Sequence, residues 1–587
     1  MNLKTRFKKL EDNIRFTSSK ISNAVENRRL NNYCDIINRI YADYQKDKTH
    51  MSKILRTTSP QTRTRLTHQE AVANITKILA KALNLNVSLA ETIASNHDIG
   101  HTFYGHDGGW WISEIEKDEG TGYLSHNAQG PRMLIYGQNI HDKIMQEIKH
   151  FHPTLSERKL DKIRKNLWKV DDGIWCHNGE TSEKEFRPNL NKTESDFIGE
   201  LKSGYVIEGF ENNNTISAST IEGCLIRPAD IISYFCRDIV DGLREGLLSE
   251  LNQEYISALN KFGVSNREIN AYLVKQDFET LSRRIENVVI KAVIDNSDKN
   301  CIRIPESVSI SVKKMRTLNN ENIVNKVTRP TEATVFPSAI RELRNIYKDI
   351  LLDNNLLERL RTANTDLSIN QELAQKYEQS EFSEDYPRLV TELSQGKSSH
   401  DKITPHMQFL EWICRISPEH YQFLENVVDD CIIHTARQET MEAIEFLRNS
   451  TTPEENGRFR MRNARVLNAM KHFEQNEITD SNIETYISSV VEKIYSGGDI
   501  NYLSKENRMA KKLATFFIGE LNDVEFIRIL VDNGLITRDQ LEDLHQKFVD
   551  IDFDNDDGLS ITDAWRKIAA KQGSILQGSH PTEEIEY

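Results

Sequence analysis

Apolar residues recur at helical spacing along most of this chain. In the stretch RLTHQEAVANITKILAKALNL, one stripe carries Ala71, Val72, Ile75, Leu79 and Leu83. An apolar stripe with polar residues opposite is typical of an amphipathic helix packed on a core. The pattern predicts a helix here and a helical fold over most of the chain.

Two further helices are indicated by signals at their starts. The stretch SLAETIASNHD begins with Ser88 and has Glu91 three residues later, which is the capping-box pattern. We expect this helix to end just before Gly100. Further along, Pro228 suits the first turn of a helix that runs through ADIISYFCRDIVDGLREGLL.

Extended structure is predicted at one place. Continuous strand patterns are scarce, and the best candidate is CIRIPESVSISV, residues 301–312. Residues from about 363 to 405 are polar and charged, and we interpret them as a helical excursion or a linker. The chain as a whole is predicted to be mostly α with a minor β element.

The composition narrows the class of protein. Of the 587 residues, 38% are hydrophobic and 28% charged, which is typical of a soluble globular protein. This length exceeds what one core usually serves, so we expect a large domain with at least one appended domain. The net charge of −14 argues against a general nucleic-acid coat, although a local basic groove is compatible with it.

Cysteine usage and hydropathy predict where the protein works. The seven cysteines are scattered and form no CxxC pair, which fits a reducing compartment. The first residues carry charge with no apolar run behind them, so they do not resemble a signal peptide. No stretch approaches the roughly 18 apolar residues of a membrane span. We therefore expect a cytoplasmic protein with no membrane partner.

The candidate chemistry is concentrated in SNHDIGHTFYGHDGGWW, residues 95–111. Three histidines and two aspartates lie between His97 and Asp107, among glycines that allow close backbone approach. The His-Asp pair occurs four times in the chain, so the pair alone carries little information. His97 and Asp98 differ from the others because they stand at a predicted helix end, where both side chains can turn toward one divalent cation.

Two more ligands would come from elsewhere in the chain. His68 lies on the preceding amphipathic helix and Asp230 on a later one. Four ligands from three helices would make an open site with room for water and a phosphate oxygen. Asp230, Tyr234 and Asp238 are spaced at i, i+4 and i+8, so they share a face that meets either solvent or a ligand cavity.

Four ordered motifs resemble those of the HD-domain deoxynucleoside triphosphate triphosphohydrolases, the dGTPase-like group. They are RTRLTH at 63–68, HDIGHTFYGHDGG at 97–109, HNAQ at 126–129 and ADIISYFCRD at 229–238. Two other stretches also look like family segments, DGIWCHNGE at 172–180 and IPESVSISVKKMRTLNNENIV at 304–324. The resemblance is dense from about 45 to 245 and implies an HD-domain helical core.

The resemblance implies three parts and a set of site residues. The parts are an N-terminal helical arm at 1–45, an HD phosphohydrolase core at 46–335 and a helical phosphohydrolase-associated C-terminal region at 336–587. The implied ligands of a divalent cation (Mg²⁺, Mn²⁺ or another transition metal) are His68, His97, Asp98 and Asp230. The implied catalytic residues are His101, His106 and His126. The implied substrate-binding residues are Arg65 for phosphate, Tyr234 and Asp238 for deoxyribose, and Asn127 and Gln129 of the HNAQ motif.

One departure from the family pattern bears on catalysis. Gly109 stands where the family has a glutamate that assists the histidine acting on the water or the leaving group. Asp107 or Glu114 could take its place. The departure leaves open either a shifted proton relay or low intrinsic activity.

The implied reaction attacks the α-phosphorus of a deoxynucleoside triphosphate, with dGTP as one candidate, and releases deoxynucleoside and inorganic triphosphate. Such an enzyme would regulate dNTP pools and could serve antiphage defence, and the family implies a homo-oligomer. One alternative is an HD-type phosphomonoesterase or cyclic-nucleotide hydrolase. Another is a nucleotide-sensing or nucleic-acid-binding regulator with weak catalysis, for which single-stranded nucleic acid would be a candidate partner. Only the first reading yields inorganic triphosphate.

Overall fold

The computed structural model describes residues 64–536 with gaps. The longer gaps cover 362–404, most of 450–482, and 497–504. The shorter gaps are 138–139, 152, 155, 178–183, 211–215, 245–247, 249–250, 276, 299, 324–329 and 354. The predicted N-terminal arm and nearly all of the polar stretch 363–405 lie outside the described residues.

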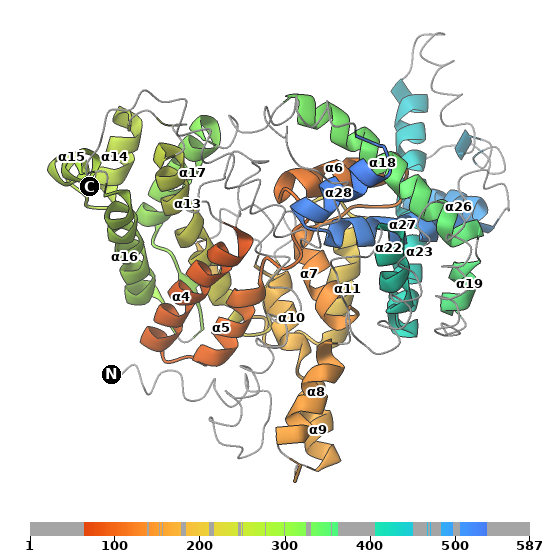
Figure 1. Ribbon diagram of the computed structural model, residues 1–587, viewed down its shortest axis with the longest axis horizontal. Coiled ribbons are helices and arrows are strands. Elements are labelled where there is room, and N and C mark those ends of the chain that lie inside the picture. The colour runs from red at the N-terminus through yellow and green to blue at the C-terminus, as the bar shows by residue number, and fades with distance from the viewer. Residues whose placement is uncertain are drawn as a thin grey trace, which may run out of the picture.

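Helices make up nearly all of the regular structure in the part described (Figure 1). The first half contains α4 (Arg65–Leu83), α5 (Val87–Asn96), α6 (His106–Asp118), α7 (His126–Ile135), α8 (Ile140–Phe151), α9 (Glu157–Arg164), α10 (Trp168–Trp175), α11 (Glu194–Val206), η1 (Gly223–Leu225), α13 (Ile226–Arg244), α14 (Gln253–Lys261), α15 (Asn266–Val274) and α16 (Phe278–Asn296). The second half contains α17 (Glu306–Asn322), α18 (Pro330–Asp353), α19 (Leu356–Arg361), α22 (Pro405–Cys414), α23 (Pro418–Asn449), α26 (Ile483–Ser496), α27 (Lys505–Glu520) and α28 (Asp523–Asp532).

The β structure is a single antiparallel pair of short strands among the described residues. β1 (Glu185–Phe186) pairs with β2 (Ile302–Arg303), and Phe186 lies opposite Ile302. The mostly α fold with a minor β element is thereby confirmed.

The prediction of extended structure over 301–312 is wrong beyond its first residues. Pro305 is the N-cap of α17, which begins at Glu306. Val312, Met315 and Leu318 are buried on one side of this helix. Their helical spacing, sustained past residue 312, outweighs the short Ser/Val alternation that suggested a strand.

The predicted start of α5 is also corrected. The N-cap is Asn86, whose side-chain oxygen accepts a hydrogen bond from the Leu89 N–H. Ser88 lies inside the helix, and Glu91 forms an ion pair with Lys77. The helix therefore begins one residue before Ser88, and the asparagine caps the Leu89 N–H in place of the predicted bond between Ser88 and the Glu91 N–H.

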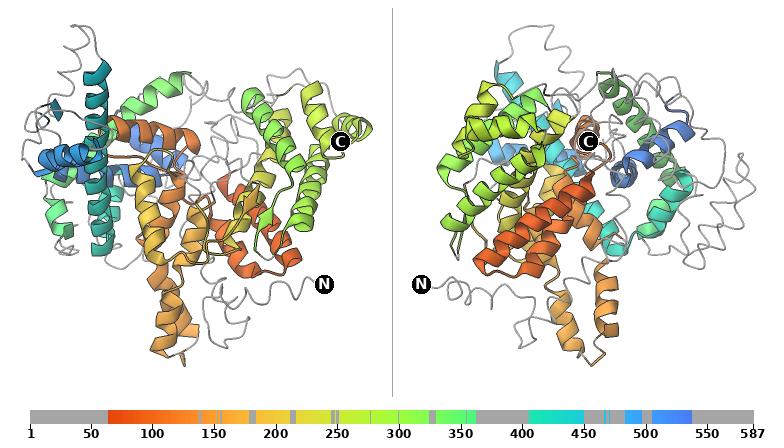
Figure 2. Two further views of the ribbon diagram at one scale, coloured as in Figure 1. Left: turned by 180° about the vertical axis from the view of Figure 1, so that it is seen from behind. Right: turned by 60° about the vertical axis from the view of Figure 1, so that its left-hand side comes forward.

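The described helices form two groups that lie side by side. In Figure 1, α4 and α5 lie with α13–α17, while α6, α7 and α11 lie with the C-terminal helices. Both views in Figure 2 show the same division. α10 contacts α5 of the first group and α7 of the second, so it joins the two groups.

The hydrophobic core is largely continuous across the described chain. One cluster of buried residues extends from Val72 to Ile536, and a smaller one includes Ala436 and Val491. α18 runs without a break across the predicted boundary at 335/336. None of the described helices is both long and apolar enough to cross a membrane.

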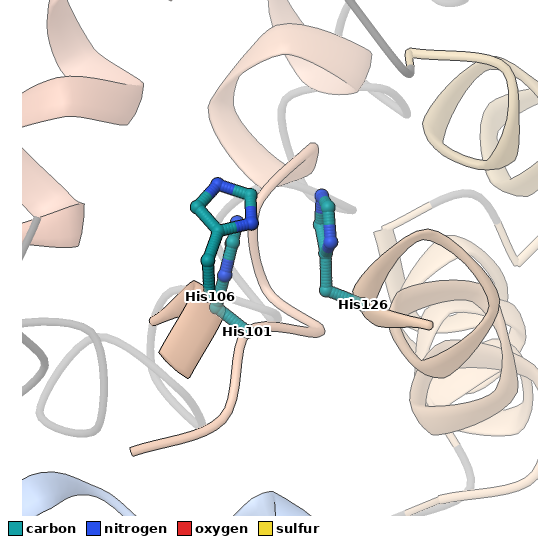
Figure 3. Close-up of side chains that lie close together, drawn as sticks. All are labelled: His101, His106 and His126. Carbon is teal, nitrogen blue, oxygen red and sulfur yellow. The ribbon is translucent and has the colours of Figure 1, made fainter. Parts of the chain in front are cut away.

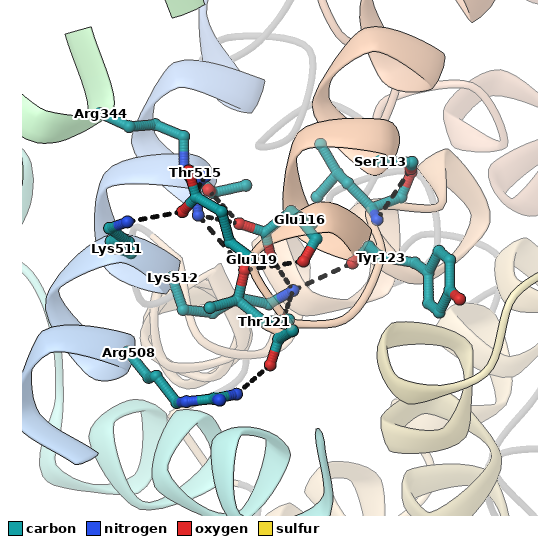
Figure 4. A network of polar contacts seen from close by, with 12 residues as sticks. Ser113, Glu116, Glu119, Thr121, Tyr123, Arg344, Arg508, Lys511, Lys512 and Thr515 are labelled. Carbon is teal, nitrogen blue, oxygen red and sulfur yellow. Dashed lines mark hydrogen bonds and ion pairs between the residues drawn. The ribbon is translucent and has the colours of Figure 1, made fainter. Parts of the chain in front are cut away.

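A buried charge network attaches the C-terminal helices to α6 (Figure 4). The Glu116 carboxylate accepts hydrogen bonds from Arg344 and Lys512, each at 2.5 Å, and from the Thr515 hydroxyl at 2.6 Å. Arg344 comes from α18, and Lys512 and Thr515 come from α27. α6 also begins with His106, so the network fixes the helix that carries a candidate catalytic residue.

Candidate metal centre and active site

Arg65 and His68 are positioned by the start of α4. The Thr64 side chain accepts a bond from the Thr67 N–H, and the Thr67 hydroxyl accepts one from the Thr64 N–H. This capping box starts the helix at Arg65, so Arg65 and His68 fall three residues apart on one face. Both side chains are buried.

His97 and Asp98 lie at the end of α5, as predicted. His97 is the C-cap residue of the helix, and the chain turns through Gly100. A Cβ atom at Gly100 would stand 2.1 Å from the backbone oxygen of His126. Glycine therefore lets the first turn of α7 pack directly on this turn, which brings His126 beside Asp98.

Four side chains from α4, α5 and α13 converge at this point. His68 Nε2 lies 2.9 Å from Asp230 Oδ1 and 3.6 Å from Asp98 Oδ2. His97 Nε2 lies 3.5 Å from Asp98 Oδ1 and 3.7 Å from Asp230 Oδ1. Ligand atoms bound to one cation at about 2.0–2.2 Å stand about 3–4 Å apart. His68, His97 and Asp98 therefore have the spacing that a shared cation requires, and Asp230 lies within 3.7 Å of both histidines.

The hydrogen bonding of His97 fits a metal ligand. Its Nδ1 lies 2.7 Å from the Ala94 carbonyl oxygen, which fixes the proton on Nδ1. Its buried Nε2 makes no hydrogen bond among the described residues, although two carboxylates face it. A ring nitrogen held between two carboxylates, with the other ring nitrogen bonded to the backbone, is suited to a divalent cation.

The charges at this point also favour a cation. Burial opposes ionisation of Asp98, but its interactions with His97, His101 and Arg65 outweigh burial and hold the pKa of Asp98 well below its usual range. Burial likewise opposes ionisation of Asp230, but the neighbouring His68 and His97 lower its pKa. Burial would lower the pKa of His97, yet the two carboxylates raise it to about 9. A cation bound here would displace that proton.

Three histidines form a second group beside the first (Figure 3). The His101 ring stacks on the His126 ring, with centroids 3.9 Å apart, and the His106 ring stands edge-on to both. Burial and the nearby Arg65 charge lower the pKa of His101 well below its usual range, and burial with neighbouring histidines does the same for His126. Both rings are therefore neutral near pH 7. His106 is exposed, so it can exchange protons with solvent.

His177 is a site residue that sequence reasoning missed. It follows the end of α10 and is buried, with Nε2 at 3.6 Å from Asp98 Oδ1. Its ring contacts those of His97 and His126, with centroids 5.0 and 5.3 Å away. Burial and the adjacent His97 lower its pKa to about 4. The stretch 172–180 carried a family resemblance, but no spacing rule relates His177 to residues some 50 to 80 positions away.

The candidates for deoxyribose binding lie together on α13. Tyr234 is partly buried, and the Arg316 guanidinium lies 5.4 Å from the centre of its ring. Asp238 is buried one turn further along the helix. Asp230 lies one turn before Tyr234 on the same face of α13, so the proposed sugar contacts lie next to the candidate cation ligand.

The other candidates for substrate binding occupy different surroundings. Arg65 Nη1 lies 2.8 Å from Asp98 Oδ2, so its charge already faces the cation site. Asn127 has a buried side-chain amide with no hydrogen-bond partner among the described residues, which suits a group that awaits a ligand. Gln129 donates instead to the Gly519 carbonyl at 2.6 Å and so contacts α27.

Comparison with known proteins agrees with this geometry. Residues 65–234 match the family model described as HD domain, and this range includes all of the candidate site residues except Asp238. HD domains depend on a metal ion, and this chain holds His and Asp groups placed to bind one. Residues 65–234 of this chain therefore form an HD domain whose side chains are placed to bind a metal ion.

Within this class, the chain is similar to deoxyguanosinetriphosphate triphosphohydrolase-like proteins. It is 30% identical over 210 residues to one from Rhodopseudomonas palustris, covering 35% of this chain and 46% of the relative. It is 34% identical over 187 residues to a relative from Caulobacter sp., and the match covers 32% of this chain and 40% of the relative. It is 29% identical over 295 residues to a relative from Brucella ovis, and the match covers 50% of this chain and 63% of the relative. The matches thus span less than two thirds of these relatives.

Proposed function

We propose that this protein hydrolyses deoxynucleoside triphosphates to deoxynucleoside and inorganic triphosphate, with dGTP as the first substrate to test. The observation that carries the proposal is the convergence of His68, His97, Asp98 and Asp230 at cation-sharing distances. The names of the similar proteins support the same reaction class. A role in controlling dNTP pools, including during phage infection, would follow from this activity.

The residues around the cation site have the chemistry that the reaction needs. A bound divalent cation would supply positive charge to a phosphate oxygen. His106 is exposed at the start of α6 and is our candidate for moving a proton. The neutral ring of His126 can donate a hydrogen bond to the leaving oxygen, while the neutral His101 lies between it and Asp98.

The sugar contacts would select deoxyribose. In our proposal, the Asp238 carboxylate accepts a hydrogen bond from the 3′-hydroxyl and the Tyr234 ring packs against C2′. A ribose hydroxyl in that position would be buried against the ring without a partner, which is costly. ATP should therefore be a much poorer substrate than dATP.

The test is product analysis with each of the four dNTPs, alone and mixed, and with ATP, in Mg²⁺ or Mn²⁺. We expect deoxynucleoside and intact triphosphate in equal amounts. The His106→Ala variant should lose turnover while keeping its metal content. Release of monophosphate or pyrophosphate, or binding without turnover, would overturn the proposed reaction. A loss of metal in His106→Ala would overturn the role given to this residue.

A further inference from the structure

A buried arginine links two helices that carry parts of the candidate site. Arg227 is the second residue of α13, and its side chain reaches the C-terminal end of α10. We propose that Arg227 is a positioning residue, which holds these two helix ends together and thereby keeps the ligands of the cation site in place. This inference rests on the cation site of the proposed function, but it does not depend on which reaction the site catalyses.

Arg227 donates hydrogen bonds to two backbone carbonyl groups. Its Nε donates to the Cys176 carbonyl and its Nη2 to the Ile216 carbonyl, each at 2.6 Å. Cys176 is the C-cap residue of α10, whereas Ile216 precedes η1, which leads directly into α13. The arginine is only 5% exposed. Its planar guanidinium can bond both carbonyls at once, which a lysine ammonium on one flexible stem does less well.

The Cys176 carbonyl lies where a helix needs an external donor. Carbonyl groups at the C-terminal end of an α-helix have no N–H partner within the helix, and a buried carbonyl without a partner is costly. The same end carries a partial negative charge, so a cation is favourable there. The Arg227 guanidinium supplies the donor and the charge together. The end of α10 is thereby tied to the first turn of α13.

The residue that follows Cys176 is His177, which lies in the candidate site. Its Nδ1 lies 2.5 Å from the Ile174 carbonyl oxygen in the last turn of α10, and its Nε2 lies 3.6 Å from Asp98 Oδ1. Its ring centroid lies 5.0 Å from that of His97. A shift of the end of α10 would therefore move this imidazole against two candidate cation ligands. The bond to the Cys176 carbonyl opposes that shift.

The same arginine lies on the face of α13 that carries Asp230. Side chains three residues apart on a helix are neighbours, with Cβ atoms about 5–6 Å apart. Asp230 Oδ1 lies 2.9 Å from His68 Nε2 and 3.7 Å from His97 Nε2. A movement of the first turn of α13 would change both distances. Because Arg227 anchors this turn to α10, it also holds Asp230 toward the two histidines.

A second buried network holds the body of α10. Lys192 Nζ lies 2.6 Å from Asp172 Oδ1 and 2.5 Å from Glu200 Oε2. Asp172 Oδ2 accepts a hydrogen bond from the Ser219 N–H, also at 2.6 Å. These contacts do not involve Arg227, so they remain when the arginine is replaced. A substitution at Arg227 should therefore displace the end of α10 locally while the rest of the helix stays in place.

The experiment measures the affinity of the metal-free, full-length chain for Mn²⁺, with free Mn²⁺ detected by electron paramagnetic resonance. Arg227→Met keeps the length of the side chain but removes both hydrogen bonds. Loss of a group that orients metal ligands typically weakens metal binding about 10- to 100-fold, so we expect at least about a tenfold loss of affinity. Arg227→Lys can bond one carbonyl, so it should lose affinity too, but less than Arg227→Met.

The matched control is Arg508→Met. Arg508 is also buried, and it donates to the backbone carbonyl of Gly120, just past the end of α6. α6 carries none of the proposed cation ligands. Arg508→Met should therefore lower the free energy of unfolding, measured by urea denaturation, without changing the affinity for Mn²⁺.

Unchanged Mn²⁺ affinity in Arg227→Met would overturn the proposal. Equal losses of affinity in Arg227→Met and Arg508→Met would also overturn it, because the effect would then follow general destabilisation. If Arg227→Met does not fold, wild-type affinity in Arg227→Lys would overturn it instead.

These outcomes are separable from those of the proposed function. Triphosphate release by a wild-type protein whose Mn²⁺ affinity does not depend on Arg227 would contradict only this inference. Weaker Mn²⁺ binding in Arg227→Met, without triphosphate release by the wild-type protein, would contradict only the reaction.

Discussion

At the scale of single residues, the site depends on histidines whose protons are placed by their surroundings. His97 and His177 each direct Nδ1 to a backbone carbonyl, so Nε2 faces Asp98. His101 and His126 are kept neutral by burial and nearby positive charge. His106 differs because it is exposed, and it has no glutamate three residues later on α6.

Restoring that glutamate tests how His106 works. A Cβ at Gly109 would meet only the Thr102 hydroxyl, at 3.8 Å, so a side chain fits there. Glutamate at i+3 can reach His106 and hold its proton, so Gly109→Glu should raise kcat. Replacing helical glycine should also stabilise the fold by about 0.5–1 kcal/mol.

Steady-state kinetics measure the change in kcat, and urea denaturation measures the change in stability. Gly109→Gln is the matched control, because it adds a side chain of the same size without the charge. The control should gain the same stability without the gain in kcat. Equal kcat in the wild-type protein and both variants would show that His106 needs no carboxylate partner at this position.

At the scale of elements, the loop between His101 and His106 is held by a helix from the far end of the chain. Tyr104 has a positive φ of 52°, and its backbone N–H donates to Asp523 Oδ1 at 2.7 Å. Phe103 stacks on Phe526, with ring centroids 3.5 Å apart. α28 thus fixes a strained turn that sets the separation of two catalytic candidates.

Removing this support should reduce catalysis without removing metal. Asp523→Ala leaves the Tyr104 N–H without its acceptor, and a small displacement of a catalytic group can cost on the order of 10²-fold in rate. We expect kcat to fall at least about tenfold while the bound Mn²⁺ stays the same.

Asp523→Asn is the matched control, because it keeps an acceptor oxygen and should retain most of the activity. Unchanged kcat in Asp523→Ala would contradict the role of α28. Equal losses in the alanine and asparagine variants would contradict the hydrogen bond as its basis.

The network around Glu116 gives a second prediction at this scale. Burial would raise the pKa of Glu116, but Lys512 and Arg344 outweigh it and lower the pKa. A lowered folded-state pKa means that the ionised carboxylate stabilises the fold above the unfolded value of about 4.3, and that this stability is lost as pH falls through the folded value. Glu116→Gln leaves two buried cations partly uncompensated, so it should cost about 3–5 kcal/mol at pH 7.

Urea denaturation at a series of pH values measures this difference. It should shrink as pH falls below the unfolded value of about 4.3, because the unfolded chain then binds a proton that the folded carboxylate does not yet bind. Glu208→Gln, which breaks the exposed pair with Lys117, is the control and should cost less than about 1 kcal/mol. A pH-independent cost for Glu116→Gln would contradict the account.

At the scale of the whole molecule, the C-terminal helices contact the elements that carry the candidate site. Besides Asp523, Gly519 receives the Gln129 side chain, and Glu520 accepts a hydrogen bond from Arg132 of α7. These contacts join residues almost 400 positions apart. The described C-terminal helices therefore share the core that positions the site.

Sequence patterns predicted the local structure better than the long-range contacts. Periodicity identified α4 and α13, and the resemblance placed His68, His97, Asp98 and Asp230 in one site, where the structure brings them together. Periodicity shows which face of a helix is buried but not what covers it, so the role of α28 and the Glu116 network could not be predicted. His177 was missed for the same reason, since the fold alone brings it to Asp98.

The most direct test of the central claim compares Mn²⁺ bound to the wild-type chain, Asp230→Asn and Asp238→Asn. Both variants remove a carboxylate from α13, two turns apart. We predict that Asp230→Asn binds one ion fewer than the wild-type chain, while Asp238→Asn binds as many. Equal metal content in Asp230→Asn and the wild-type chain would show that these side chains do not share a cation.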